Sequence, residues 1–288
     1  MGRMLAESFY SHGAKVTIMA RTQAKLDKAV NEIESKVRGP EGASIKSVAV
    51  DVTDAAQVDV AMHKAVEMQD GEAIFCLVVA AGRAIPGYFL DQDIADFRAT
   101  MELNYFGALN CAKTVVPLMA ESQTKGQILF ISSAAAGASF LGYTSYAPTK
   151  FALRGLADGL RNEIKGLGIS VHIAYPPDTD TPGFEEENKS KPKETLQISP
   201  PEVHSAKSVT DAMMDGLLRG EYHLPSPDPV QNLLVSTTVN ITPRGRWAPL
   251  EILLSPILGV AMLIFKVHAD SCSVPYGKAK AKELAKIQ

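Results

Sequence analysis

Short apolar runs alternate with helix-like segments over roughly the first 220 residues, and this alternation limits the fold more than any other feature of the sequence. Branched apolar residues predict strands at Lys15–Ala20, Ile45–Val50, Ala73–Ala80, Gly126–Ser132 and Gly168–Tyr175. Apolar spacing, caps and breakers predict helices at Gly2–His12, Thr22–Val37, Asp93–Glu121 and Ser145–Leu167, with another starting at Thr53 or Asp54. This order predicts an α/β fold, a doubly wound parallel sheet with right-handed crossovers and helices on both faces.

The composition agrees with a globular domain and excludes several classes of protein. With 288 residues, 46% of them hydrophobic, the chain can bury a core of domain size. A net charge of −3 gives no strong electrostatic attraction to nucleic acid. Cys76, Cys111 and Cys272 lie far apart and lack zinc or redox spacing. We therefore expect free thiols in a reducing compartment and no metal site.

Ligands of such sheets bind at the carboxyl ends of the strands, so the residues after each strand are the candidates for chemistry. Arg21 follows the first strand and Lys25 lies one helical turn further on. Cations at this place in a dinucleotide fold accept the 2′-phosphate of NADP. Asp51 and Val52 are placed to contact adenine, and Gly82 lets the backbone approach a cofactor. Taken singly, the same residues fit surface cations, a helix cap and a plain turn.

Four polar residues between positions 104 and 150 form the most specific pattern. Tyr146 and Lys150 are four residues apart, so they share one face of the predicted helix. A lysine cation beside a phenol is expected to lower the tyrosine pKa from about 10 and to make it a usable acid or base. Ser133 closes a strand, and Asn104 lies within a helix, where a buried amide needs partners. Tyr146 and Lys150 alone would more often be an exposed helical pair, whereas all four together are far more specific.

The set Asn104, Ser133, Tyr146 and Lys150 resembles the catalytic tetrad of the short-chain dehydrogenase/reductases, and the likeness runs from Gly2 to about Gly220. It implies a Rossmann-like fold, NADPH as cofactor and hydride reduction of a ketone. Tyr146 would protonate the product oxygen, which Ser133 stabilises. Lys150 would lower the Tyr146 pKa and hold the nicotinamide ribose, and Asn104 would anchor a relay water. The implied cofactor contacts are Gly2, Arg21, Lys25, Asp51, Val52, Gly82, Tyr146, Lys150 and Thr181.

A closer likeness is carried by Ala174–Asn188 (AYPPDTDTPGFEEEN) and Tyr146–Leu156 (YAPTKFALRGL). These segments are similar to family members that reduce a sphingoid 3-ketone to the alcohol in sphingolipid synthesis. The likeness implies a sphingoid ketone substrate, an endoplasmic reticulum membrane location with the active site facing the cytosol, and a possible homodimer. Two alternatives stay open: another lipid- or steroid-type ketone reductase of the family, or a catalytically inactive truncated form.

The likeness begins inside the family's glycine-rich loop, which has the form T-G-x-x-x-G-x-G or G-G-x-x-x-G-x-G. Only the last glycine is present, as Gly2, and the strand before the loop is absent from the sequence. We therefore expect a Rossmann-like sheet whose first strand and most of the phosphate cradle are missing, as in a truncated chain or one with a mis-assigned start. Such a sheet would expose unpaired ladder groups.

The charged segment Asp178–Pro201 is expected to be a mobile loop over the substrate, or a solvated disordered one. A helix is predicted after it, from Ser199 or Pro200 to about Arg219. We expect three parts in the chain: a Rossmann-like domain over residues 1–220, a linker over 221–247, and an apolar membrane-associated segment with a basic tail over 248–288.

The uncharged stretch Ile252–Phe265 would be about 21 Å long as a helix, short of the roughly 30 Å hydrocarbon core of a bilayer. Residues typical of interfacial anchors flank it: Arg244, Arg246, Trp247 and Lys266. We expect a helix or helical hairpin that lies in one leaflet and contacts membrane lipid. A buried core helix or an oligomer interface is the alternative.

Overall fold

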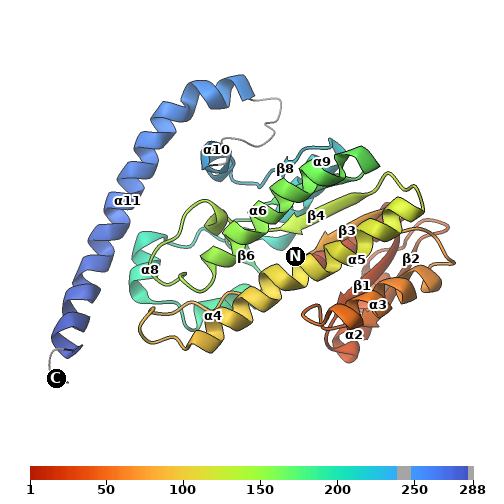
Figure 1. Ribbon diagram of the computed structural model, residues 1–288, viewed down its shortest axis with the longest axis horizontal. Coiled ribbons are helices and arrows are strands. Elements are labelled where there is room, and N and C mark those ends of the chain that lie inside the picture. The colour runs from red at the N-terminus through yellow and green to blue at the C-terminus, as the bar shows by residue number, and fades with distance from the viewer. Residues whose placement is uncertain (239–247, 285–288) are drawn as a thin grey trace.

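Parallel strands form the centre of the molecule and helices lie around them, as Figure 1 shows. The structure, a computed structural model, describes residues 1–238 and 248–284. One group of strands pairs β1 (Lys15–Ala20) with β2 (Ser44–Ala49). A second contains, in this order, β3 (Cys76–Val79), β4 (Gln127–Ile131), β5 (Ser170–Ala174) and β8 (His223–Leu224). A short parallel pair joins β6 (Thr179–Asp180) to β7 (His204–Ser205). The predicted α/β fold with parallel strands is confirmed.

The central strand β4 shows why helices must cover both faces of the sheet. The side chains of Ile128, Leu129 and Phe130 have no exposed surface. Successive side chains of a strand point to opposite faces. Ile128 and Phe130 accordingly enter one apolar core, while Leu129 and Ile131 enter another. The continuous apolar run that predicts this strand therefore reflects burial on two sides.

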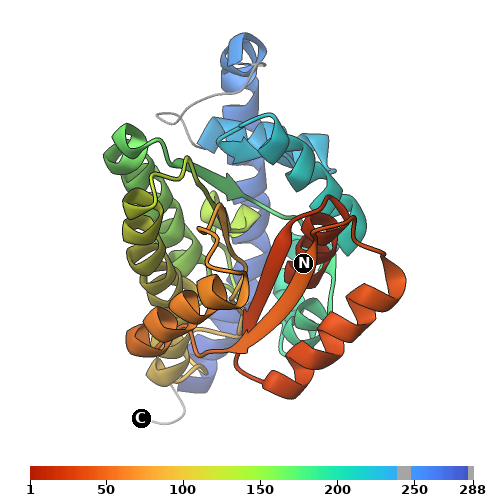
Figure 2. The same ribbon diagram turned by 90° about the vertical axis from the view of Figure 1, so that its right-hand side faces the viewer.

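Two layers of helices supply the apolar surfaces that bury the strands, and Figure 2 shows them on either side of the sheet. The helices that share a core with Phe130 are α3 (Ala55–Met68), α5 (Gly107–Glu121) and α6 (Ala147–Ile164). Those on the opposite face are α1 (Gly2–Ser11) and α9 (Ala206–Leu218). Next to α1, α2 (Gln23–Lys36) packs Ile33 against Ile45 of β2.

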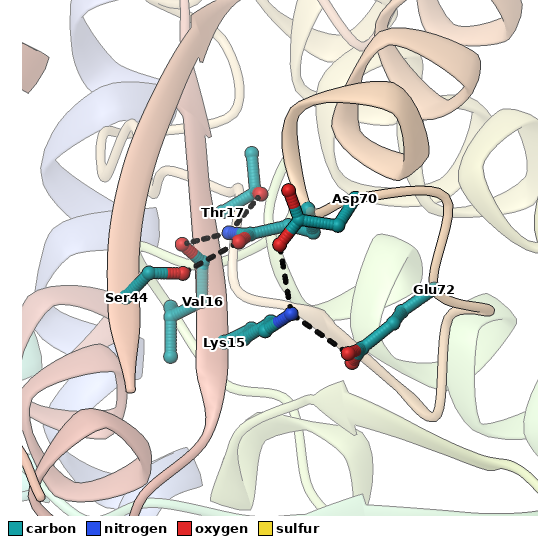
Figure 3. A network of polar contacts seen from close by, with 7 residues as sticks. Lys15, Val16, Thr17, Ser44, Asp70 and Glu72 are labelled. Atoms are coloured by element: carbon teal, nitrogen blue, oxygen red, sulfur yellow. Dashed lines mark hydrogen bonds and ion pairs between the residues drawn. The ribbon is translucent and has the colours of Figure 1, made fainter. Parts of the chain in front are cut away.

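Polar side chains fix β1 to the turn that follows α3, as Figure 3 shows. The Lys15 ammonium forms ion pairs with Asp70 at 2.9 Å and with Glu72 at 2.7 Å. The buried amide of Gln69 donates to the carbonyl oxygen of Val16 at 3.0 Å. Among the described residues β1 and β3 belong to separate hydrogen-bonded groups, so the sheet is divided between them. In the Rossmann-like sheet that the sequence predicts, the missing first strand would lie between β1 and β3.

The charged segment after β5 is more regular than expected. Asp178–Pro201 contains β6 and two short helices, α7 (Pro182–Asn188) and α8 (Lys193–Ile198), so the alternative of a disordered loop is wrong. Its mobility and its position over the substrate stay predictions. Thr181 begins α7 by accepting a hydrogen bond from the backbone N–H of Phe184, and a proline stands in the first turn. These local signals favour a helix in spite of the polar composition.

The helix predicted from Ser199 or Pro200 starts later, at Ala206, because the Ser205 hydroxyl caps it there. The stretch 221–247, predicted as a linker, contributes β8 to the sheet and forms α10 (Pro229–Thr238). Residues 239–247 and 285–288 lie outside the described residues, and so do the predicted anchors Arg244, Arg246 and Trp247.

The C-terminal segment forms one helix, α11 (Ala248–Leu284), which runs along one side of the molecule in Figure 1. It continues through Pro256 and Pro275, so the predicted alternative of a helical hairpin is wrong. Proline removes one helical hydrogen bond and can kink a helix without ending it. The most apolar 18-residue window of α11 has a mean hydropathy of 2.1 and is 6% buried, which excludes a buried core helix. By length and composition, α11 is the one helix among the described residues that could cross a membrane.

Two phenylalanine substitutions test the burial of β4. Phe130→Ala should lower the free energy of unfolding by about 3 to 5 kcal/mol, because a cavity replaces a fully buried ring. Phe75→Ala removes a ring that is 58% exposed and should change it by less than about 0.5 kcal/mol. Urea denaturation followed by circular dichroism measures both. Equal losses in the two variants would contradict the two-sided core.

Candidate active site

The residues that follow the parallel strands line one edge of the sheet, because the strands run in the same direction. Arg21, Asp51 and Gly82 follow the carboxyl ends of β1, β2 and β3, and Ser133 follows β4. The start of α6 lies at the same edge, since Lys150 contacts the last residue of β4. The fold therefore gathers the predicted catalytic and cofactor residues from distant parts of the chain.

The first turn of α6 carries the tyrosine and the lysine. Tyr146 stands immediately before α6 and Lys150 lies one turn into it, with Pro148 in the first turn, where its missing N–H costs little. The Lys150 Nζ lies 5.6 Å from the centre of the Tyr146 ring. The hydroxyl of Ser133 interacts with that of Tyr146 and acts to lower the tyrosine pKa. Three of the four predicted catalytic residues thus lie together.

Burial dominates the acidity of Tyr146. Desolvation raises its pKa, and this effect exceeds the lowering by the Ser133 hydroxyl. The ammonium of Lys150 donates to the carbonyl oxygen of Ile131 at 3.0 Å, and the expected lowering of the Tyr146 pKa by Lys150 stays a prediction. The phenol of Tyr146 is consequently protonated at neutral pH. This is the form that can donate a proton.

Lys150 is a buried cation with unused hydrogen-bonding capacity. Its side chain is almost fully buried, and desolvation lowers its pKa to about 8. An ammonium has three N–H groups, and the carbonyl of Ile131 takes one of them. A Cβ placed on Gly82 would lie 3.6 Å from the Lys150 Nζ and 3.1 Å from the Asn104 Oδ1. Gly82 therefore lets the backbone after β3 come close to both side chains.

A π-helical turn sets Asn104 into the site. The predicted helix over Asp93–Glu121 is divided into α4 (Ile94–Met101), a π-helical turn (Glu102–Phe106) and α5, and such turns often mark functional sites. Asn104 is buried: its Oδ1 accepts from the backbone N–H of Arg83, and its Nδ2 donates to the Arg83 carbonyl, both at 2.9 Å. Nδ2 also donates to the Thr149 hydroxyl at 3.0 Å, and that hydroxyl donates to the Tyr146 carbonyl at 2.7 Å. Asn104 thus joins the loop after β3 to the start of α6.

Sequence reasoning missed the residues that hold this arrangement in place. Thr149 directly precedes Lys150 and has no spacing signal of its own, and Arg83 takes part through its backbone alone. Ser145 was also missed: it donates to the Ile85 carbonyl at 2.9 Å and accepts from Gln92 at 3.1 Å. These contacts join segments that are far apart in the sequence, so no local pattern could reveal them.

The predicted nucleotide-binding residues lie at the ends of β1 and β2. Arg21 and Lys25 are exposed, and no ion pair is recorded for either within the described part of the chain. The Asp51 carboxylate accepts from the backbone N–H and the hydroxyl of Thr53, which lowers the Asp51 pKa, and Arg21 adds a smaller lowering. The helix cap of α3 is Asp54, so Asp51 is not that cap. Val52 packs against the main core.

The start of α1 completes this edge. Among the described residues, no side chain caps the N-terminus of α1, and a Cβ on Gly2 would lie 3.4 Å from the Ala80 Cβ, beside the end of β3. Free N–H groups and the dipole at a helix N-terminus favour phosphate. Together with the spare N–H groups of Lys150 and the close approach at Gly82, these residues fit a nicotinamide dinucleotide. Within residues 1–238 and 248–284, no group of three His, Cys, Asp or Glu side chains is placed to hold a metal ion.

The acidity of Lys150 can be measured directly. In protein labelled with ¹³C-lysine, one side-chain resonance should titrate near pH 8, because burial disfavours the charged form. Lys150→Arg should remove that resonance and so assign it. Lys15, whose ion pairs raise its pKa, provides the internal comparison at high pH. The finding that no lysine resonance titrates below the usual range would contradict the buried ammonium.

Comparison with known proteins agrees with this geometry. The chain matches the short chain dehydrogenase family over residues 1–192. It is 37% identical over 268 residues to 3-ketodihydrosphingosine reductase of Dictyostelium discoideum, covering 90% of this chain and 80% of that protein. It is 42% identical over 200 residues to 3-dehydrosphinganine reductase of Danio rerio, covering 69% of this chain and 59% of that protein. The chain thus matches less than two thirds of the Danio rerio protein.

A solved structure shares the fold. The structure of ElxO with NADP bound has a TM-score of 0.62 and 25% sequence identity, and the likeness covers 73% of this chain and 84% of that one. The cofactor class that fits the sheet edge is a nicotinamide dinucleotide. Because the family matches more than half of the sequence, the chain belongs to the short chain dehydrogenase family of oxidoreductases.

Proposed function

We propose that this chain reduces the ketone of 3-ketodihydrosphingosine to the alcohol, giving dihydrosphingosine, with NADPH as the reductant. The observation that carries the proposal is the identity of 37% over 90% of the chain to the Dictyostelium discoideum reductase of that name. The site supports it, because Ser133, Tyr146 and Lys150 lie together at the carboxyl edge of the sheet with a buried asparagine beside them.

The proposed reaction needs a hydride, a proton and a stabilised oxygen. When bound, the nicotinamide supplies the hydride that adds to the carbonyl carbon. Tyr146 donates its phenolic proton to the ketone oxygen, and its raised pKa keeps that proton in place at neutral pH. The Ser133 hydroxyl donates a hydrogen bond to the same oxygen as negative charge develops there. The products balance: ketone, hydride and proton give the secondary alcohol.

Lys150 has two roles in this proposal. Its spare N–H groups hold the ribose hydroxyls of the nicotinamide. With a pKa of about 8 it is mostly cationic at neutral pH, and the positive charge stabilises the phenolate that remains after proton transfer. Asn104 anchors a water that returns a proton through Lys150. The bonds from Asn104 to Arg83 and Thr149 keep its amide oriented for this role.

The remaining residues of the sheet edge hold the dinucleotide. The start of α1 at Gly2 faces the pyrophosphate, and Gly82 allows the cofactor to approach the backbone. Arg21 and Lys25 take the 2′-phosphate that distinguishes NADPH from NADH. Asp51 and Val52 contact the adenine. Thr181, which caps α7, contacts the nicotinamide carboxamide or the pyrophosphate.

We also propose that α11 contacts membrane lipid. Its outward side chains are apolar and exposed, including Leu253 at 73%, Ile257 at 65% and Val267 at 62%. Its inner face contacts the catalytic domain as far as Lys280, which supports a helix lying along the membrane surface rather than crossing it. A sphingoid substrate partitions into the same membrane.

The proposed location is the cytosolic side of the endoplasmic reticulum, and the chain is proposed to form a homodimer.

Tyr146→Phe should lower turnover of 3-ketodihydrosphingosine by about 100-fold or more, because the general acid is lost. NADPH affinity should stay within a few-fold. The matched control is Tyr10→Phe in α1, which should keep normal turnover. NADPH oxidation in detergent micelles measures the rate, and cofactor fluorescence measures the affinity. Normal turnover in Tyr146→Phe would rule out this proton donor.

Arg21→Asp should raise the KM for NADPH by about tenfold or more and shift the preference towards NADH, because a charge-assisted contact to the 2′-phosphate becomes a repulsion. Arg38→Asp makes the same charge change at an exposed arginine after α2 and should leave the preference unchanged. The ratio of kcat/KM for the two cofactors is the readout. An unchanged ratio in Arg21→Asp would remove Arg21 from the phosphate site.

A further inference from the structure

A cavity of about 500 Å³ lies between α11 and the segment that follows β4. One wall is the stretch Ala138–Leu141, and the other is one side of α11, where Met262, Phe265 and Ala269 contribute. The volume falls within the range of about 300 to 1,000 Å³ found for small-molecule sites. The charged side chains on the α11 wall, Lys266 and Asp270, form an ion pair with each other at 3.4 Å. No net charge therefore faces the cavity from this wall.

Aromatic rings connect this cavity with Tyr146. The Phe265 ring of α11 lies 5.8 Å from the ring of Phe140, centre to centre. Phe140 lies 5.4 Å from Tyr143, and Tyr143 lies 5.9 Å from Tyr146. All three distances are typical of packed aromatic pairs. A row of packed aromatic rings therefore connects the lining of the cavity with the residue that would protonate the ketone.

The wall formed by α11 is held in place by specific contacts. The less exposed residues of α11 recur every three to four positions and so face the domain: Leu258, Met262, Phe265, Ala269, Cys272 and Tyr276. The Tyr276 ring stacks on Tyr88 with centres 4.2 Å apart. His268 donates to the carbonyl of Gln197 in α8 at 3.1 Å, and Lys280 pairs with Asp91 at 3.1 Å. These contacts make the cavity a part of the folded domain.

We propose that this cavity holds the hydrocarbon chain of the ketone substrate, with the reacting carbonyl at Tyr146. The inference rests on the proposed function, which supplies a substrate that carries both a polar ketone head and a long apolar chain. The arrangement of polar and apolar groups favours this occupant. Polar hydroxyls lie at one end of the row of aromatic rings, and a largely apolar cavity lies at the other end. The exposed apolar face of α11 lies on the far side of the same helix, so the cavity adjoins the helix that is proposed to contact membrane lipid.

Filling the cavity tests this inference. Ala269 is 7% exposed and lines the cavity, and Ala269→Phe places a ring in it. Gly259 also lines the cavity, and Gly259→Leu is a second filling variant, since no atom of the described residues lies within 4 Å of a Cβ at Gly259. Ala261→Phe makes the same change as Ala269→Phe at an exposed position of α11 and is the control. Each variant is assayed in detergent with 3-ketodihydrosphingosine and with a short-chain homologue that carries the same 2-amino-3-keto head.

Both filling variants should lower kcat/KM for the long-chain ketone by about tenfold or more, the loss expected when two or more methylenes are no longer buried. Turnover of the short-chain ketone should be unchanged, which also shows that the variants are folded. An equal loss for both ketones, or no loss for either, would overturn the chain-binding role. Altered vesicle binding without a chain-length effect would assign the cavity to membrane lipid and overturn it too. If the unaltered protein reduces neither ketone, the proposed function fails instead.

Discussion

The side chains of Ile128, Leu129 and Phe130 in β4 are fully buried, and their burial on both faces of the strand determines much of the remaining architecture. A strand that is apolar on both faces needs a helical layer on each side, so the chain passes through at least one helix between successive strands of the main sheet. Parallel strands are the result, and their carboxyl ends meet at one edge of the sheet. The polar residues after each strand are thereby brought together although they are far apart in the sequence.

Burial also sets the chemistry at that edge. Desolvation raises the pKa of Tyr146 and lowers the pKa of Lys150 to about 8. The phenol therefore stays protonated at neutral pH, while the lysine loses its proton more easily than an exposed lysine does. The buried amide of Asn104 bonds to the Arg83 backbone and to the Thr149 hydroxyl. This fixes the turn that presents Tyr146. The same low polarity that stabilises the fold therefore keeps the proton donor ready for a reduction.

The sequence predicts the parts of the molecule that depend on local pattern. Lys15–Ala20 is a strand with the predicted bounds, and the helix after it begins beyond Thr22 as expected. Properties that depend on contacts between residues far apart in the sequence could not be predicted from it. The acidity of Tyr146 depends on how deeply it is buried, which the four-residue spacing to Lys150 does not encode. The segment Asp178–Pro201 looks like a loop by composition, yet Thr181 and the following proline begin a helix there. The continuity of α11 through Pro256 and its packing against Phe140 likewise depend on contacts with distant residues.

The transfer of a deuterium label tests ketone reduction by this chain most directly. Purified protein in detergent is given 3-ketodihydrosphingosine and NADPH that carries deuterium at both C4 positions of the nicotinamide. Hydride addition at the carbonyl carbon predicts dihydrosphingosine that carries one deuterium at C3, identified by fragmentation in a mass spectrometer. A folded protein that binds NADPH but forms no deuterated alcohol from this ketone would contradict the proposed function.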